Sequence, residues 1–285
     1  MDYVKSPLNY TGGKFKLLDS IIPNIPDDTL VFLDLFAGGG TVGVNMVDRA
    51  NIVILNELLT PVTDFYNGVK ACGVEQSLRM VQNRIEYYGL TKTNQEGYLN
   101  IRNDYNNGDR DWVTFYTMLM YSFNYQIRFN SQGRYNMPFG KNRSSFNKST
   151  EKNFRSFGNK LVSNNLVVTN SDFRDINYDT FTEGFFVYVD PPYLITTASY
   201  NENGGWGEQE EIDLLALLDK LNEQGCKWML SNVLEHKGKE NTLLRDWSNK
   251  YHVTDLNYNY KNSNYQGKNT DKPTREVIIT NYSIN

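Results

Sequence analysis

The sequence is poor in the residues that build disulfide frameworks and metal sites. It has two cysteines and two histidines among 285 residues. Cys72 and Cys226 lie far apart along the chain, so we expect free thiols in a reducing compartment. His236 and His252 are too few for a zinc site with the usual ligands. We therefore expect neither a disulfide-stapled protein nor a metal-dependent one.

Long apolar runs are also missing. No run reaches the roughly 18 apolar residues that cross a bilayer, and "MDYVKSPLNY" at the N-terminus lacks the apolar core of a signal peptide. We expect a soluble, cytoplasmic protein with no membrane partner. The length suits one large α/β domain with an insertion, or two smaller domains.

Basic charge is scarce overall but concentrated in one segment. The net charge is −4, yet residues 128–160 carry eight basic side chains and one acidic one, a local net charge of +7. Such a segment could bind a phosphate backbone, because only the surface that faces the polyanion matters. A solvated charged surface is the alternative.

A glycine loop follows the first apolar strand that we expect. In "TLVFLDLFAGGGTVGVNMV", the strand Val31 to Phe36 runs into Gly38, Gly40 and Gly43, which have the G-x-G-x-x-G spacing, and then into a helix. Glycines let the backbone turn tightly and let a ligand approach a helix N-terminus. Alone, this spacing is a weak signal.

Two acidic residues strengthen the interpretation of the loop. The second strand, "NIVILNE", ends in Glu57, which could accept hydrogen bonds from ribose hydroxyls. These features together indicate a nucleoside cofactor in a doubly wound sheet. Asp34, just before the loop, would repel a pyrophosphate but could face the ammonium of S-adenosyl-L-methionine (AdoMet); alternatively, it caps the following turn.

Residues 59–157 differ in character and predict a helical insertion. "VEQSLRMVQNRIEYYGL" and "DWVTFYTMLMYSF" are helix-like, and the insertion ends in the basic, aromatic segment "NYQIRFNSQGRYNMPFGKNRSSFNKS". Interleaved Arg, Asn, Gln and aromatic residues can supply contacts to base edges and phosphates as well as stacking surfaces.

The α/β pattern then resumes. We expect strands in "NNLVVTNSDF", "FFVYV" and "CKWMLSNV", and a short helix in "ENTLLRDWSNKY". "YHVTDLNY" and "REVIITNY" should pair as a closing hairpin across the loop 261–274. In "EQEEIDLLALLDKLNEQG" we expect an amphipathic helix that stops near Gly225 and buries Ile212, Leu215, Leu218 and Leu221 on one face.

The strand "FFVYV" ends in an unusual turn, Asp190-Pro191-Pro192-Tyr193. The prolines remove two N–H donors, so the turn presents carbonyl oxygens and a carboxylate. Tyr193 adds a flat ring on which a planar group could stack. An exocyclic amine of a nucleobase fits such a pocket, whereas the simpler reading is a strand-terminating turn with an exposed Asp.

These motifs resemble those of the Dam family of DNA adenine-N6 methyltransferases. Asp190 to Tyr193 match the signature of amino-directed DNA methyltransferases, "LDLFAGGGTVGVN" looks like their AdoMet motif, and "NYTGGK" looks like the motif that closes over AdoMet. "RFNSQGRYNMPFGK" is similar to the family's target-recognition segment. "FVYVDPPYLITTASYN" and "LSNVLEHKGKENTLLRDWSNKY" look particularly like the phage-encoded Dam enzymes.

The resemblance implies a Rossmann-like, class I AdoMet-dependent methyltransferase sheet with an inserted helical target-recognition domain. The catalytic domain would comprise residues 1–58 and 158–285, and the recognition domain residues 59–157. The activity implied is adenine-N6 methylation of double-stranded DNA, most often at GATC, by base flipping. The enzyme would act as a monomer or weak dimer on DNA, in a bacterial cell or a phage-infected host.

The resemblance also implies roles for individual residues. The AdoMet contacts would be Tyr10, Lys14, Asp34, Phe36, Gly38, Gly40, Glu57, Asp172, Phe173 and Asp190. Asn124, Arg128 and Pro138 match positions that the family uses at the bases. The full set of DNA-contact candidates is Asn124, Gln126, Arg128, Asn130, Arg134, Pro138, Lys141 and Arg143. Asp190, Pro191, Pro192 and Tyr193 would form the catalytic turn.

Two departures from the family pattern concern the target site. Gln126 stands where the family usually has an apolar residue against a thymine methyl, and Asn9 stands where cellular members often have lysine. Alternatives to the adenine-N6 activity are methylation of another DNA site, of cytosine N4, of RNA or of a protein glutamine. From other classes, an NAD-dependent oxidoreductase would use the glycine loop and Glu57 but not the proline turn, and a non-enzymatic DNA-binding protein would not need the catalytic turn.

Overall fold

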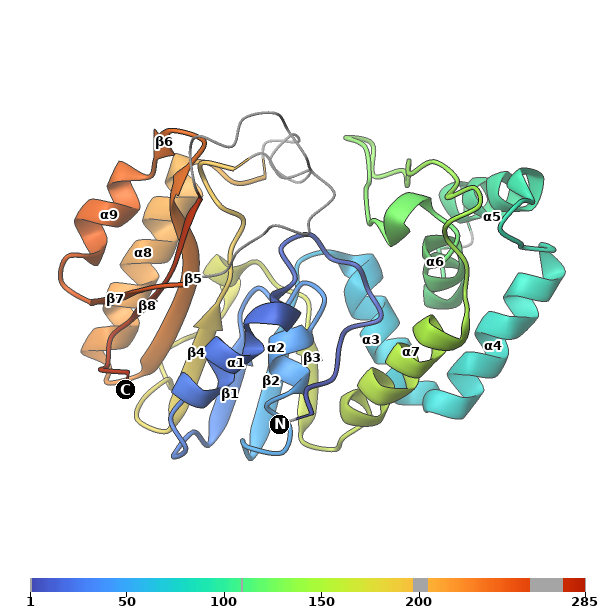
Figure 1. Cartoon of the computed structure of the whole chain (residues 1–285). Coiled ribbons are helices and arrows are strands. Elements are labelled where there is room, and N and C mark those ends of the chain that lie inside the picture. Colours follow the sequence, from blue (N-terminus) through green and yellow to red (C-terminus); the bar gives the residue numbers. More distant parts are fainter. Residues whose placement is uncertain (1, 109, 197–204, 257–273, 285) are drawn as a thin grey trace.

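The computed structural model describes residues 2–108, 110–196, 205–256 and 274–284 (Figure 1). The greater part of the loop expected at 261–274 lies outside these residues. A central sheet forms one part of the molecule and a group of helices forms the other. None of the helices within the described residues is long and apolar enough to cross a membrane.

The sheet is mostly parallel and has the strand order β3-β2-β1-β4-β5-β8-β7. Its strands are β1 (Val31–Asp34), β2 (Ile52–Asn56), β3 (Leu166–Thr169), β4 (Phe185–Val189), β5 (Lys227–His236), β7 (His252–Asp255) and β8 (Arg275–Thr280), and the short β6 (Lys239–Glu240) pairs with β5. β8 lies antiparallel between β5 and β7, which confirms the predicted hairpin. The fold is Rossmann-like, as predicted, because β1 to β5 are parallel in the doubly wound order β3-β2-β1-β4-β5, and the strand order reverses between β1 and β4.

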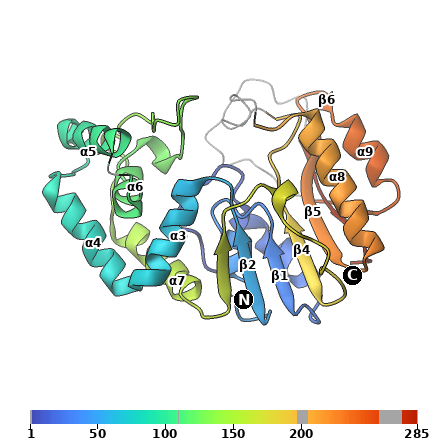
Figure 2. The ribbon, with the colours of Figure 1, turned by 180° about the vertical axis from the view of Figure 1, so that it is seen from behind.

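Helices cover both faces of this sheet. On the face seen in Figure 1 lie η1 (Lys14–Leu17), α1 (Leu18–Ile21), η2 (Ile22–Asn24) and α2 (Thr41–Val44). On the face seen in Figure 2 lie α8 (Glu208–Glu223) and α9 (Thr242–Ser248), and η4 (Phe173–Asp175) contacts α8. The central strands are buried on both faces, as parallel strands usually are, which explains their continuous apolar and aromatic sequences.

The predicted buried face of α8 is wrong at one position. Ile212 is 45% exposed, whereas Leu214, which the prediction left out, is fully buried. The predicted residues recur every three positions, and such a series drifts by about 60° per step around a helix of 3.6 residues per turn. The buried stripe follows the mixed three- and four-residue spacing of Glu211, Leu214, Leu215 and Leu218 instead.

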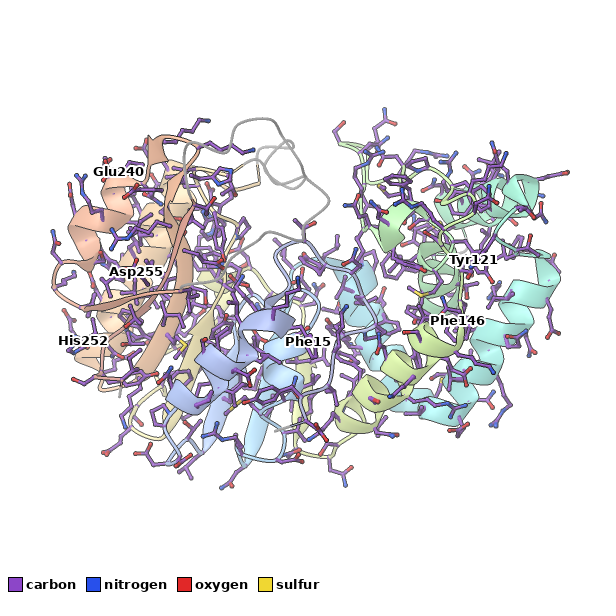
Figure 3. The ribbon with its side chains drawn as sticks, viewed as in Figure 1. Phe15, Tyr121, Phe146, Glu240, His252 and Asp255 are labelled. Atoms are coloured by element: carbon purple, nitrogen blue, oxygen red, sulfur yellow. The ribbon has the colours of Figure 1, made fainter. Side chains whose placement is uncertain are left out.

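The helical part comprises α3 (Thr60–Cys72), α4 (Val74–Tyr87), α5 (Gln95–Asn107), α6 (Trp112–Leu119), η3 (Phe123–Tyr125) and α7 (Lys148–Leu161). Tyr121 and Phe146 lie within it, at the end opposite to His252 and Asp255 of the edge strand β7 (Figure 3). One continuous apolar core joins these helices to one face of the sheet. The expected domain boundary between residues 157 and 158 falls inside α7.

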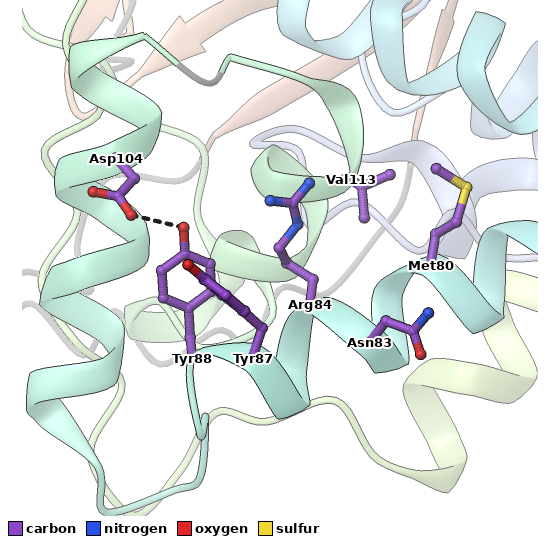
Figure 4. A pocket seen from close by; sticks show the side chains of 7 residues that line it. All are labelled: Met80, Asn83, Arg84, Tyr87, Tyr88, Asp104 and Val113. Carbon is purple, nitrogen blue, oxygen red and sulfur yellow. Dashed lines mark hydrogen bonds between the residues drawn. The ribbon is translucent and has the colours of Figure 1, made fainter.

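An open hollow of about 560 Å³ lies among α4, α5 and α6 (Figure 4). At its wall the Tyr88 hydroxyl donates a hydrogen bond to Asp104, at 2.8 Å. None of the residues that line it is a candidate from the sequence. The site indicated by the motifs lies instead at the carboxyl ends of the strands.

Candidate active site

Three buried or nearly buried carboxylates mark the carboxyl edge of the sheet. Asp34 ends β1, Glu57 follows β2, and Asp190 follows β4. The pKa of Asp34 is raised to about 8, mainly by burial and also by the nearby charges of Asp190 and Glu57. Carboxyl groups therefore gather where ligands of doubly wound sheets bind, and Asp34 largely keeps its proton at neutral pH.

The glycine loop has the backbone geometry that its sequence predicts. Gly38 and Gly40 have φ values of +51° and +71°, in the left-handed region that favours glycine. A Cβ on Gly43 would lie 2.1 Å from a methyl carbon of Leu55, so only glycine lets α2 pack this closely on β2. The Tyr66 hydroxyl of α3 donates to the Gly38 carbonyl at 2.5 Å. No motif in the sequence predicts this contact from the helical part.

Glu57 fixes the same loop from the other side. Its Oε2 accepts the Gly38 N–H and its Oε1 accepts the Leu59 N–H, both at 2.8 Å. Tyr10, another predicted cofactor residue, donates its hydroxyl to Glu57 at 3.4 Å. Burial raises the pKa of Glu57, and these hydrogen bonds oppose the shift. Each carboxylate oxygen has two lone pairs, so Glu57 can accept further hydrogen bonds from a ligand.

Asp34 has the geometry of the capping role that the sequence left open. Its Oδ2 accepts the Gly43 N–H at 2.9 Å, and the side chain is 1% exposed. No hydrogen bond from a described residue reaches the other oxygen, Oδ1. One carboxylate can therefore hold the loop through Oδ2 and a ligand through Oδ1.

Aromatic rings form one wall beside the loop. Phe36, Phe173 and Trp206 contact one another with ring centroids 5.5 to 5.8 Å apart. The first two were predicted, whereas Trp206 was not. Asp172 accepts hydrogen bonds from the Arg174 side chain at 2.8 and 2.9 Å, which lower the pKa of Asp172.

At the catalytic turn, donors from the chain itself occupy Asp190. Its Oδ1 accepts the Tyr193 hydroxyl at 2.9 Å, and its Oδ2 lies 2.8 Å from the Lys14 ammonium. Lys14 also donates to the Tyr193 hydroxyl at 2.8 Å and to the Gly12 carbonyl at 2.9 Å. Burial raises the pKa of Asp190, and the charge of Lys14 and its hydrogen bond oppose the shift. Lys14, expected at AdoMet, thus lies at the proline turn, where Pro191 is buried and Pro192 half-buried.

A fourth member of this cluster was missed by sequence reasoning. Glu276 of β8 is 5% exposed, and its Oε1 lies 3.8 Å from the Lys14 ammonium and 3.4 Å from the Tyr193 hydroxyl. A single acidic residue inside the apolar strand "REVIIT" was the available signal, because buried carboxylates are rare unless paired. Val233 of β5 pairs with it beside a bulge.

The predicted DNA-contact residues lie in a hairpin and the segments that flank it. Phe129 bridges Tyr135 antiparallel, and Arg128 binds Asn136 through its guanidinium, at 2.7 and 2.9 Å. The Asn130 side chain accepts two backbone N–H groups of the turn, including that of Arg134. Asn130 therefore shapes the hairpin.

The segment before the hairpin contacts the N-terminal motif. Asn124 has a φ of +55°, and its carbonyl accepts the Asn9 side chain at 2.7 Å. Asn9 also pairs with Gln126 through the backbone. The two residues that depart from the family pattern are thus neighbours.

After the hairpin, the chain returns to the same segment. The Pro138 carbonyl accepts the Phe123 N–H at 2.8 Å, and the Arg143 guanidinium lies 4.7 Å from the Phe123 ring centroid. Lys141 is exposed.

Ion pairs in the folded chain neutralise part of the positive charge of the basic segment 128–160. Arg155 pairs with Glu75 and Glu151, and Lys160 pairs with Asp48. The local net charge of +7 therefore overstates the surface charge of this region. Lys141 and Arg143 form no ion pair with a described residue and remain available to a polyanion.

A family model described as "D12 class N6 adenine-specific DNA methyltransferase" matches residues 10–262. The chain belongs to this family. The matched range includes the glycine loop, the hairpin and the proline turn. Membership of a methyltransferase family argues against the oxidoreductase interpretation of the glycine loop.

Curated relatives agree with this family. The chain is 44% identical over 285 residues to "Type II methyltransferase M.FokI" of Planomicrobium okeanokoites, covering 99% of the chain and 43% of the relative. It is 39% identical to "Modification methylase StsI" of Streptococcus sanguinis (98% and 43% covered). It is 25% identical to "DNA N-6-adenine-methyltransferase" of Escherichia phage P1 (81% and 30% covered). The chain spans less than half the length of each.

Proposed function

We propose that this chain transfers a methyl group from AdoMet to N6 of adenine in double-stranded DNA. The observation that carries the proposal is the Asp190 carboxylate, which follows β4 close to the glycine loop and already binds N–H donors of an ammonium. The same oxygens suit the amino group of a base.

The side chains around the glycine loop suit AdoMet better than a dinucleotide. Asp34, Glu57 and Asp190 lie close together and offer oxygen acceptors, which can bind an ammonium and ribose hydroxyls but give a pyrophosphate no donor. Asp34 Oδ1 would face the ammonium and Glu57 the ribose. The rings of Phe36 and Phe173 would contact the adenine of AdoMet, with Asp172 at its edge.

The catalytic turn would orient the target amine. AdoMet supplies a methyl group on a positively charged sulfur. Asp190 and the Pro191 carbonyl would accept the two amino hydrogens, which directs the nitrogen lone pair toward that methyl group. A C–N bond forms as the C–S bond breaks, its electron pair stays on sulfur, and the nitrogen then releases one proton to solvent. Asp190 stabilises the positive charge that develops on the nitrogen, and Tyr193 would stack on the flipped base.

The helical part, residues 59–157, would act as the recognition domain. Arg128, Gln126 and Asn124 would contact base edges, while Lys141 and Arg143 would contact phosphates. Arg134 and Pro138 would border this surface, and Asn130 would hold the hairpin that presents it. We expect a monomer or weak dimer in the cytoplasm, and GATC remains the predicted target.

The test is transfer of labelled methyl from AdoMet to two short duplexes that differ only in GATC versus GTAC, with the product nucleoside identified after digestion. N6-methyladenine in the GATC duplex alone would support the activity and the site. Label in both would keep the activity and discard GATC. Absence of label in duplexes of many sequences, with AdoMet bound, would overturn the proposal.

The variant Asp190→Ala should lose transfer by about a hundredfold or more, because preorganised electrostatic groups contribute that much to catalysis. DNA binding should change little, since Asp190 contacts only the flipped base. Filter binding and single-turnover rates would measure the two properties separately. Transfer near the wild-type rate would contradict the assigned role.

A further inference from the structure

The acceptor oxygens of Asp190 are occupied before any substrate binds. Tyr193 holds Oδ1 and Lys14 holds Oδ2, at 2.9 and 2.8 Å. A target amine that takes the position of Tyr193 or Lys14 on one of these oxygens displaces that donor. Tyr193 can leave by turning its ring onto the base, but an ammonium displaced from a buried carboxylate requires another acceptor.

Glu276 lies where such an acceptor is needed. Glu276 lies on β8, and its Oε1 is 3.8 Å from the Lys14 ammonium. The Lys14 side chain is 4% exposed. A movement of about an ångström would turn this contact into a hydrogen bond. The bulge in β5 beside Glu276 is a feature that re-aims side chains near active sites.

The charges of the cluster also favour a role for Glu276. The formal charges of Asp190, Glu276 and Lys14 sum to one net negative charge. Burial and the neighbouring carboxylates raise the pKa of the Tyr193 hydroxyl well above its usual value, so it adds no charge. A single net negative charge favours the positive charge that develops on the target nitrogen, whereas Asp190 and Lys14 alone would sum to zero.

We propose that Glu276 is a positioning residue that receives Lys14 when the target amine displaces it from Asp190 and keeps the site at one net negative charge. The inference rests on the proposed methyl transfer. It assigns Lys14 to the proline turn as a displaceable occupant of the amine site, and it makes the last strand of the sheet part of the reaction centre.

The experiment compares Glu276→Gln, Lys14→Met and the double variant with the wild type in single-turnover transfer at saturating DNA and AdoMet. Glu276→Gln should slow transfer by about tenfold or more, because Lys14 stays on Asp190 and the net charge falls to zero. The double variant restores one net negative charge, so it should transfer faster than Glu276→Gln. A purely structural role for Glu276 predicts a double variant no faster than Glu276→Gln, and this result would overturn the proposal.

The pH profile supplies an independent readout. The ionisable groups that face Asp190 are Lys14 of η1, Glu276 of β8, Tyr188 and Tyr193 near β4, and Asp34 of β1. In Lys14→Met the opposing charge is lost, so the pKa of Asp190 should rise and activity should be recovered only at higher pH. An unshifted profile in this variant would contradict the assigned contact.

The matched control is Glu211→Gln. Glu211 is a fully buried carboxylate on α8 that accepts hydrogen bonds from Trp206 and from Asn241, the residue that caps α9. The substitution should lower thermal stability, and adding Lys14→Met should not speed its transfer. AdoMet binding by calorimetry and thermal melts would show which variants are folded, and Glu276→Ala, which also lacks the charge, replaces Glu276→Gln if the latter is not folded. An inactive wild type would refute the proposed function, whereas an active wild type without rescue in the double variant would refute this inference alone.

Discussion

Asp34 illustrates how one residue can serve both the fold and the site. Its carboxylate caps the turn at Gly43, and burial raises the pKa of Asp34 from 3.8 to about 8. The folded protein therefore keeps a proton that the unfolded chain releases over this range. A cationic ligand beside Oδ1 would favour the ionised form and would bind more strongly where Asp34 has lost its proton.

Asp34→Asn should change how stability depends on pH. The raised pKa means that the free energy of unfolding of the wild type falls as pH rises from about 4 to about 8, and the substitution removes this term. Urea unfolding near pH 5 and near pH 8 would measure this. The free energy of unfolding of the variant, relative to that of the wild type, should be higher at pH 8 than at pH 5. Asp172→Asn is the control, because the pKa of Asp172 is lowered and its effect lies at acidic pH. A difference between Asp34→Asn and wild type that does not vary with pH would contradict the shift.

The sequence predicted which residues gather at the site better than what they contact. The glycines, Glu57 and Asp190 lie together because each ends or follows a parallel strand, and strand ends can be located from apolar runs and turn residues. The contact of Lys14 with Asp190 could not be predicted, since it depends on how η1 lies across the sheet. Glu276 lies on β8, which pairs antiparallel with β5, and no local sequence pattern predicts the register of that pairing.

At the scale of elements, α3 joins the helical part to the cofactor loop. The Tyr66 hydroxyl donates to the Gly38 carbonyl, and Lys70 of the same helix donates to the carbonyls of Leu161, the last residue of α7, and of Ser163 just after it. The helices that would contact DNA and the loop that would hold AdoMet are therefore coupled through one helix.

Tyr66→Phe should weaken AdoMet binding by about fivefold, because it removes a hydrogen bond worth about 1 kcal/mol that fixes the loop. Calorimetry would measure the dissociation constant. Tyr116→Phe on α6 is the matched control, since the Tyr116 hydroxyl is buried without a partner among the described residues and its removal should leave binding unchanged. Equal effects of the two substitutions would show that the Tyr66 hydroxyl does not hold the loop.

Sequence patterns located most elements but not every boundary or face. Apolar runs and turn signals located β1 to β5, the β7–β8 hairpin and the helices α4, α6, α8 and α9, whereas α3, α5 and α7 were not located individually. The three-residue spacing predicted for α8 misplaced Ile212, and α2 ends at Val44 after four residues. Helix α7 continues through the expected domain boundary, since its apolar face packs on both α3 and α2.

At the scale of the whole molecule, an acidic protein presents basic residues on a small part of its surface. The sequence located the basic segment, but its pairing in space depended on acids up to 112 residues away, as for Lys160 and Asp48. Only the folded chain shows which cations are neutralised.

The double variant Lys141→Ala with Arg143→Ala should reduce the slope of log K for DNA against log salt by about two, since each phosphate contact contributes about one. The control is Arg155→Ala with Lys160→Ala, whose cations are already paired with acids. Affinity measured over a range of salt concentrations gives both slopes. Equal losses in the two double variants would show that the ion pairs open on DNA.

The insertion of β8 between β5 and β7 has a consequence for synthesis of the protein. The strand that carries Glu276 is synthesised after the other strands of the sheet that the structure describes, yet it occupies an interior position of the sheet and borders the residue at position 14. A nascent chain released up to Asp255 can form the glycine loop and the proline turn, but its amine site lacks one wall. On the proposed role of Glu276, competence for the reaction requires that β8 has been synthesised and paired, and assaying stalled chains of increasing length would time this step.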